Sequence, residues 1–458
     1  MTEHSSVAPA GVEPLPAAAG NLFCFQSANA VCWSILLGFP MVLYFQSMGA
    51  SATVLGIVMG AAPLLTVLQI PAAGFIEKVG YRRFVFTGWA VRSIFAVGMV
   101  LVVLFQGRLG GTASVLLMLL MLLAFSTARG FASAGILPWF TQLIPEKVRG
   151  RYLSLEQICM LAVVTFVSLS CGLVFHLLPG RSGFLMVIAT GALFGMICLI
   201  FLRRIPDVEI EATSRSRQPI PWAALLGHRN FRRILLYNFV TLLAWTGSSI
   251  MVVPLLRDEF GLGNGAFMAI HASAAGASIL GLFILRKSLD RSGSKPLLKT
   301  SILLQGVHFT LWGLIATRII PLNWVTLVLV QGSWGCVHAL YQTSNMRLVM
   351  QVIPPMGRSH FFAIFSVSNS LALGLLPVLW GFSIDLLGGF QFEMAGVTVN
   401  RYTLLYAAVT IFALSSMFAL ARIEESDTLS MSDFLNELLV KSPSNALSRV
   451  VLRRPIFK

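Results

Sequence analysis

The sequence contains few charged residues. Only 11% of its 458 residues are Asp, Glu, Lys or Arg, and 56% are hydrophobic, whereas soluble globular chains are about 25% charged. This composition excludes an ordinary soluble domain. At about 20 mainly apolar residues per membrane-spanning helix, plus short connections, a chain of this length accommodates about twelve crossings of a bilayer.

Common catalytic and metal-binding motifs are also missing. The chain has no nucleophile elbow, no HExxH zinc motif, no Walker A lysine and no paired acids inside an apolar run. Its six cysteines all lie in apolar stretches, and their spacing fits neither a metal site nor a disulfide framework. We therefore expect a protein that is not an enzyme and that has no cofactor and no metal site.

Basic residues are in excess, with a formal net charge of +15 and a pI near 10.1. In a soluble protein this excess would indicate nucleic-acid binding. Here 26 of the 33 Lys and Arg residues lie in alternate connections and the C-terminal tail, and five lie in the other connections. By the positive-inside rule, both termini are expected in the cytoplasm. We expect a bilayer rather than a nucleic acid as partner, and the plasma membrane, in bacteria the inner membrane, as location.

Twelve apolar runs bounded by charged residues or Gly/Pro clusters predict an all-α polytopic membrane protein. The runs cover residues 21–46, 52–75, 84–106, 113–143, 153–178, 184–202, 232–256, 264–285, 297–317, 321–350, 360–386 and 402–421. The expected parts are an N-terminal cytoplasmic tail (1–20), a six-helix half (21–202), a cytoplasmic linker (203–231), a second six-helix half (232–421) and a C-terminal cytoplasmic tail (422–458).

The two halves repeat three short patterns in the same order. The paired positions are Pro40 and Gly49 with Pro254 and Gly263, 77–82 with 290–295, and 144–149 with 353–358. Three such pairs at nearly constant offset indicate an internal duplication. Two six-helix repeats in the same orientation are found in some secondary transporters.

The segment AGFIEKVGYRR, residues 73–83, resembles the signature of the major facilitator superfamily. The matching positions are Ala73, Glu77, Lys78, Gly80, Arg82 and Arg83. Ala73 stands where Gly is usual, and Glu77 where Asp is commoner. The second half matches at Asp290, Arg291, Gly293 and Lys295, with Arg286 in place of the leading small residue. The fifth span lacks the Gly-Pro motif of proton-driven drug exporters, so no subfamily is assigned.

The resemblance implies a latch at the cytoplasmic mouth. Glu77 would face the start of the eleventh span near Ser359, and Asp290 the start of the fifth near Ser154, because a carboxylate is stabilised by a helix N-terminus and by nearby arginines. Alternatively, these charges only solvate loops and satisfy the positive-inside rule. The candidate gating residues are Glu77, Gly80, Arg82, Arg83, Arg149, Asp290, Arg291, Gly293, Lys295 and Arg358.

Candidate substrate-binding residues are polar or aromatic and recur at helical spacing within spans. The resemblance implies that spans one, four, seven and ten line the cavity. The candidates are Asn29, Trp33, Arg92, Arg129, Asn238, Trp245, Gln331, Trp334, His338, Gln342 and Asn345. The alternative for each is a structural role, since polar residues in spans bond neighbouring helices and Trp gathers at membrane interfaces.

Two arginines, Arg92 and Arg129, lie within spans. An unpaired cation in the bilayer core is costly, so each must face protein, water or an anion. All eighteen acids fall in tails, in connections or near span ends, and none is expected at the midplane. Proton symport in this superfamily commonly relies on a buried carboxylate, so this distribution favours facilitated diffusion or exchange.

These observations predict a monomeric transporter that moves a small polar organic solute by alternating access. Amides and aromatic rings among the candidates favour a sugar-like solute. The two arginines make an organic anion the main alternative, and a drug transporter or a transport-inactive sensor on the same fold is also open.

Overall fold

The computed structural model describes residues 15–16, 18–208, 226–291, 294–353, 358–394 and 397–424. Within these ranges, side chains are described except at 146, 282–291, 358–360 and 394. Most of the predicted tails (1–20 and 422–458) and of the linker (203–231) lie outside the described residues.

The N-terminal half consists of helices that cross the bundle six times. They are α1 (Ala18–Leu36), α2 (Phe39–Ser47), α3 (Ala52–Leu65), η1 (Thr66–Leu68), α4 (Gln69–Val79), α5 (Tyr81–Leu109), α6 (Gly111–Ala132), η2 (Ser133–Gly135), α7 (Ile136–Leu143), α8 (Glu146–Leu177) and α9 (Arg181–Arg204). Three crossings are interrupted: one between α1 and α2, one at η1 and one at η2. The break between α1 and α2 precedes Pro40, and Pro63 lies just before the 3₁₀ turn η1. Both breaks lie next to a proline, which cannot donate a helical hydrogen bond.

The C-terminal half crosses the bundle six more times. Its elements are α11 (Arg229–Pro254), η4 (Leu255–Glu259), α12 (Asn264–Arg291), α13 (Ser294–Ala316), α14 (Trp324–Val352), α15 (Arg358–Leu387), β1 (Gln391–Met394), β2 (Val397–Asn400) and α16 (Arg401–Ala421). The strands form an antiparallel hairpin with Gln391 opposite Asn400. The sequence analysis did not predict this hairpin, which occupies the connection between the last two spans.

The helices agree with the twelve predicted runs. In the described part of the chain, nine helical segments are long and apolar enough to cross a membrane by length and composition alone. The other three crossings are α12, α13 and α14, which are also mainly apolar and are 28, 23 and 29 residues long. At about 1.5 Å per residue, each can cross a hydrocarbon core about 30 Å thick. The all-α polytopic fold is thereby confirmed.

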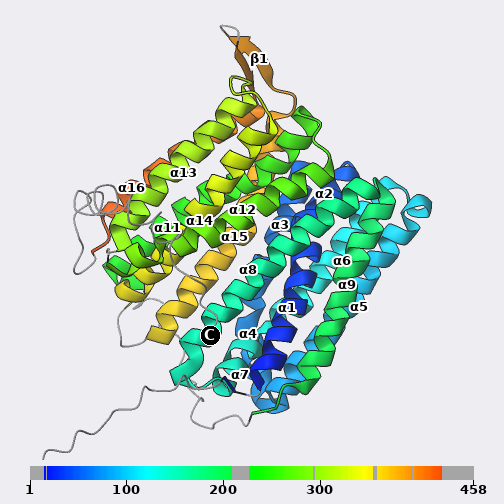
Figure 1. Ribbon diagram of the computed structural model, residues 1–458, viewed down its shortest axis with the longest axis vertical. Coiled ribbons are helices and arrows are strands. Elements are labelled where there is room, and N and C mark those ends of the chain that lie inside the picture. Colours follow the sequence, from blue (N-terminus) through cyan, green and yellow to red (C-terminus); the bar gives the residue numbers. More distant parts are fainter. Residues whose placement is uncertain are drawn as a thin grey trace, which may run out of the picture.

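The bundle has two distinct ends. The hairpin end is the end from which β1 projects, at the top of Figure 1; the linker end is the opposite end, with α4 and α7 (Figure 1). Within the halves, α1 packs on α9 and α5 on α6, while α12 packs on α14 and α13 on α16. Between the halves, the extensive contacts are α3 with α15 and α8 with α12.

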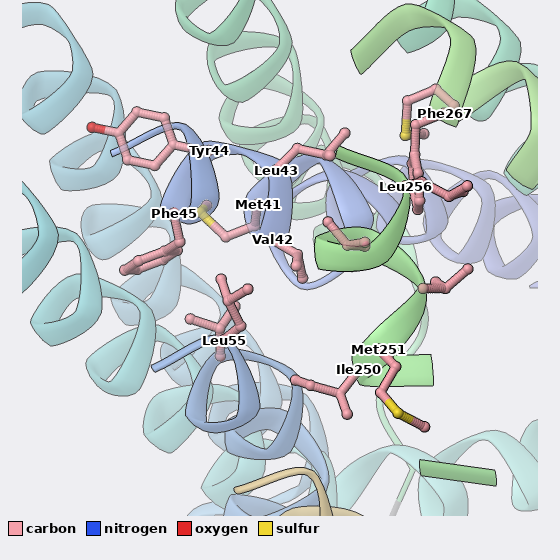
Figure 2. Packing of buried hydrophobic residues seen from close by; sticks show 14 of the residues in the cluster. Met41, Val42, Leu43, Tyr44, Phe45, Leu55, Ile250, Met251, Leu256 and Phe267 are labelled. Atoms are coloured by element: carbon pink, nitrogen blue, oxygen red, sulfur yellow. The ribbon is translucent and has the colours of Figure 1, made fainter. Parts of the chain in front are cut away.

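Apolar side chains from both halves pack together at the hairpin end. Figure 2 shows Met41 and Val42 of α2 and Leu55 of α3 in one buried cluster with Met251 of α11 and Leu256 of η4. Val42, Met251 and Leu256 are almost completely buried. We call this cluster the hairpin-end seal, since its buried apolar side chains fill the space between the two halves.

Hydrogen bonds between the halves gather at the same end. The carboxylate of Asp385, near the end of α15, accepts from the backbone N–H of Ala52 at 2.9 Å and of Thr53 at 2.8 Å, where α3 begins. It also accepts from the Thr53 hydroxyl at 2.5 Å. Gln46 donates to Asp258 at 2.9 Å nearby. These bonds attach α2 and α3 of one half to η4 and α15 of the other.

The α3 and α15 backbones touch where glycines meet. A Cβ on Gly60 would lie 2.1 Å from the carbonyl oxygen of Gly374, and one on Gly381 would lie 2.2 Å from that of Ala52. Larger residues at these positions would push the helices apart. Small residues are the usual way for membrane helices to approach closely.

Candidate functional site

A cavity of about 500 Å³ lies between the two halves and adjoins the hairpin-end seal, since Val42 belongs to both. This volume is within the range of roughly 300–1,000 Å³ typical of small-molecule sites. We call it the central cavity. It is lined by Trp33, Ser34, Leu37, Gly38, Phe39, Pro40, Val42, Met59, Ala62, Pro63, Thr66, Arg129, Val164, Ser168, Trp245, Thr246, Ser249, Met268, His271, Ser370, Leu373 and Pro377.

The cavity wall is mainly apolar, with a few scattered polar groups. Hydroxyl groups come from both halves, for example Ser34 on α1 and Ser249 on α11. The imidazole Nδ1 of His271 lies 3.3 Å from the hydroxyl of Ser168 across the α8–α12 contact. Among the lining residues, all of which belong to the described part of the chain, Arg129 alone is a charged side chain.

Arg129 reaches the cavity because α6 lies close to the α3–η1 junction. A Cβ on the next residue, Gly130, would lie 2.1 Å from the carbonyl oxygen of Leu65. Only glycine permits this approach. No acceptor or acid within the described residues bonds the Arg129 guanidinium, and the charged side chain that acts on it electrostatically is another cation, Arg92.

An indole from each half faces the central cavity. Trp33 lies on the last turn of α1, just before the break at Gly38, and remains partly exposed. Trp245 lies on α11, and its ring centroid is 5.1 Å from that of His338 on α14. His338 therefore supports a cavity side chain without being a lining residue itself.

Arg92 is placed differently from Arg129. Its side chain is 1% exposed, and its Nη2 donates to the Asn29 side-chain oxygen at 2.9 Å. The guanidinium carbon lies 4.5 Å from the ring centroid of Trp89 and 5.4 Å from that of Phe125. Arg92 and Asn29 thus bond each other inside the N-terminal half, and neither lines the central cavity.

Part of the predicted stripe on the tenth span contacts other helices of its own half. Asn345 donates to the Asn238 side-chain oxygen at 2.8 Å, and both residues are buried. The Trp334 ring stacks on His308 with centroids 4.8 Å apart. Gln331 is half-buried and Gln342 is exposed. None of these side chains lines the central cavity.

The signature residues of the first half lie at the linker end. Glu77 is exposed near the end of α4. Gly80 has φ +87°, a left-handed conformation that favours glycine and turns the chain from α4 into α5. Arg82 donates to the carbonyl oxygen of Arg203, and Arg83 is exposed.

The remaining gating candidates are described only in part. Arg149 donates to the carbonyl oxygens of Thr141 at 2.9 Å and Ile144 at 3.3 Å, which holds the corner between α7 and α8. Lys295 donates to the carbonyl oxygen of Ile423. Gly293 and the side chains of Asp290, Arg291, Arg358 and Ser359 lie outside the description. The proposed latch therefore stays a prediction.

Several lining residues were not predicted from the sequence. Ser249 lies one turn after the candidate Trp245. Ser168 and His271 are isolated polar residues in spans that are otherwise mainly apolar. Isolated small polar residues give a weak signal, because most of them bond their own helix backbone. Ser249, for example, donates to the carbonyl oxygen of Trp245 at 3.0 Å.

Comparisons with known proteins agree with this architecture. The profile of the Major Facilitator Superfamily matches residues 22–377. No curated protein matches the chain in sequence. A mutant form of the nucleoside transporter NupG superposes with a TM-score of 0.66 at 15% identity, covering 89% of this chain and 100% of the other. A D-xylose–proton symporter superposes with a TM-score of 0.68 at 14% identity, covering 90% and 98%.

A third similar structure is a bacterial homologue of the iron transporter ferroportin in an inward-facing state. Its TM-score is 0.67 at 11% identity, and the alignment covers 89% of this chain and 98% of the other. At these identities the likeness concerns the fold alone.

Proposed function

The chain belongs to the major facilitator superfamily, and from this premise we propose that it moves a small polar organic solute across the membrane by alternating access. Membership makes it an integral membrane transport protein rather than an enzyme. The observation that supports the proposed mechanism is the central cavity between the halves, closed at one end by the hairpin-end seal. Rocking one half against the other about this cavity would expose it to each side in turn.

We further propose that the linker end is cytoplasmic and that the membrane is the bacterial inner membrane. The basic residues of the linker region and of the loops at that end support this orientation. With the hairpin end outside, the structure is closed to the exterior by the seal and the Asp385 hydrogen bonds, as in an inward-facing state. We propose that the monomer in the bilayer is the working unit, since the cavity is formed by one chain.

The placement of the amides bears on the choice of solute. A sugar-like solute was favoured because the spans contain amide side chains that bond hydroxyl groups. Asn238 and Asn345 bond each other, and Asn29 bonds Arg92. The central cavity instead presents indoles, single hydroxyls and Arg129. This placement weakens the argument for a sugar and strengthens the alternative of an organic anion.

Transport is tested with the purified full-length chain in proteoliposomes. We expect saturable uptake of at least one labelled solute from a panel of sugars, nucleosides, organic acids and amines, above the level in protein-free liposomes. As an internal control, Thr53→Cys and Asp385→Cys are combined in a cysteine-free background. Cross-linking this pair should hold the hairpin end closed and stop uptake, and reduction should restore it. If no solute enters or exchanges, the chain is a transport-inactive sensor.

A further inference from the structure

We infer that the central cavity binds an organic monoanion, whose carboxylate pairs with Arg129 and whose apolar body lies against Trp33 and Trp245. This inference rests on the proposed function, because it assumes that the central cavity is the solute site. It adds the charge and the chemical class of the solute, which family membership leaves open.

The first argument is the uncompensated charge of Arg129. Its guanidinium lines a cavity between membrane helices, and no described carboxylate or carbonyl bonds it. A cation at this depth is costly unless it faces water or an anion. The planar guanidinium matches a carboxylate with two parallel hydrogen bonds, which are among the stronger polar contacts in proteins.

The second argument is that nearby acids are already engaged. Glu156 of α8 accepts a hydrogen bond from Gln26 at 2.6 Å. Asp385 and Asp258 are bonded at the hairpin end. None of the three lines the cavity. Within the described part of the chain no carboxylate neutralises Arg129, and a solute entering the cavity can provide one.

The third argument is the field of Arg92. Its Nη2 donates to Asn29, but Asn29 is neutral, so the Arg92 charge is not cancelled. Arg92 and Arg129 act on each other electrostatically. Two cations on one side of the cavity attract an anion and repel an organic cation. Only one of them lines the cavity, so the site fits one anionic group rather than two.

The fourth argument is the shape and polarity of the remaining wall. Most of the cavity wall consists of apolar side chains such as Phe39, Met59 and Leu373 and of the indoles of Trp33 and Trp245. A sugar would lose hydration at most of its hydroxyls without gaining partners on these surfaces. An aryl or branched alkyl body would instead pack against them.

The test uses three probes with one scaffold and different charges. They are N-acetylphenylalanine (anionic), its amide (neutral) and phenylalaninamide (cationic), with glucose as a sugar. Binding to the full-length protein in detergent is measured by tryptophan fluorescence and by the rise in melting temperature with probe concentration. We expect saturable binding of the anion and of related N-acetyl amino acids with apolar side chains, and much weaker binding of the other probes.

Variants at two arginines separate a specific site from general charge. Arg129→Gln should weaken anion binding by at least about tenfold, because one charge-assisted pair is lost. Arg129→Lys should restore part of it. Arg108→Gln, at an exposed position near the end of α5, should have no effect. Equal melting temperatures of the variants without probe would show that folding is unchanged.

Failure of this inference is distinct from failure of the proposed function. If glucose or the cation binds and is transported while no N-acetyl amino acid binds, the anion inference is wrong and transport stands. The inference is also wrong if anion binding survives unchanged in Arg129→Gln. If the anion binds through Arg129 but labelled N-acetylphenylalanine neither enters nor exchanges in proteoliposomes, the site is confirmed and the transport proposal fails.

Discussion

At the scale of single residues, two arginines of the same half have different surroundings. Arg92 is enclosed by Trp89, Phe125 and Asn29. Arg129 faces the central cavity without a described partner. A buried guanidinium that keeps its charge needs its acceptor for stability, whereas one that faces a cavity is available to a ligand. We therefore expect substitutions at the two sites to affect different properties.

Replacing Asn29 by Ala should destabilise the fold. It removes the side-chain acceptor of a buried cation, and hydrogen bonds to charged groups contribute about 1.5–3 kcal/mol. The melting temperature of the purified protein should fall by several degrees. The control is Gln342→Ala, an exposed amide on α14, which should leave it unchanged. An Asn29→Ala protein of normal stability but with altered solute affinity would place the Arg92–Asn29 pair in binding instead.

At the scale of elements, acids lie at both ends of the pair formed by the α3–α4 span and α15. Asp385 near the end of α15 caps the start of α3 at the hairpin end. At the linker end the sequence predicts the converse, with Glu77 near the end of α4 facing the start of α15. The two contacts would stabilise opposite states of the transporter, because only one end is open at a time.

Asp385→Asn should favour opening of the hairpin end. The neutral amide of Asn has only one oxygen to accept from the N–H groups of Ala52 and Thr53. It also lacks the negative charge, which at a helix N-terminus contributes about 0.3–2 kcal/mol to stability. The population of the open state should rise by several-fold. Labelling of a single cysteine at Ser249, on the cavity wall, by an impermeant thiol reagent from the hairpin side should quicken. Glu393→Gln, on the exposed hairpin, is the matched control and should change nothing.

Glu77→Gln should act in the opposite direction. Loss of the carboxylate would remove the contacts with a helix N-terminus and with arginines that the sequence predicts in the state closed at the linker end, at about 1–3 kcal/mol. The same cysteine at Ser249 should become more accessible from the linker side. If its labelling rate is unchanged, Glu77 is only a loop charge that satisfies the positive-inside rule.

At the scale of the whole molecule, the charge distribution predicts which end lies inside the cell. A single cysteine at Glu393 on the hairpin should react with an impermeant reagent in intact cells, because that connection has few basic residues. A cysteine at Asp207, beside the linker, should react only after the membrane is opened. Labelling of a cysteine at position 207 in intact cells would show that the linker end lies outside, which contradicts the predicted orientation.

The distribution of acids predicts how transport is driven. Glu156, the acid nearest to the interior of the N-terminal half, is bonded to Gln26, and no acid lines the central cavity. We expect facilitated diffusion or exchange without proton coupling. In proteoliposomes, a pH gradient should not raise the accumulation of labelled N-acetylphenylalanine above that in protein-free liposomes. Protein-dependent uphill accumulation that a protonophore abolishes would show that another group, such as His338 or Glu156, takes the proton.

The sequence by itself determined the membrane class, the number of crossings, the repeat and the superfamily. These properties follow from local composition. In the hydrocarbon core of a bilayer the backbone must bond itself as a helix and most side chains must be apolar, so each crossing leaves a pattern in its own segment. The signature at 73–83 is likewise a local pattern. The break before Pro40 and the η1 turn lie next to prolines, which interrupt helices. The sequence alone does not show that residues beside these breaks line the central cavity.

Only the tertiary structure decided which polar residues face the cavity. Helical spacing places Asn345 and His338 on one face of α14, but the rotation of that helix against α11 depends on packing throughout the half. The partnership of Asp385 with Thr53 joins residues 332 positions apart. Such contacts depend on how the two halves meet, and that fit is set by side-chain shapes from both halves together, which no single segment of sequence specifies.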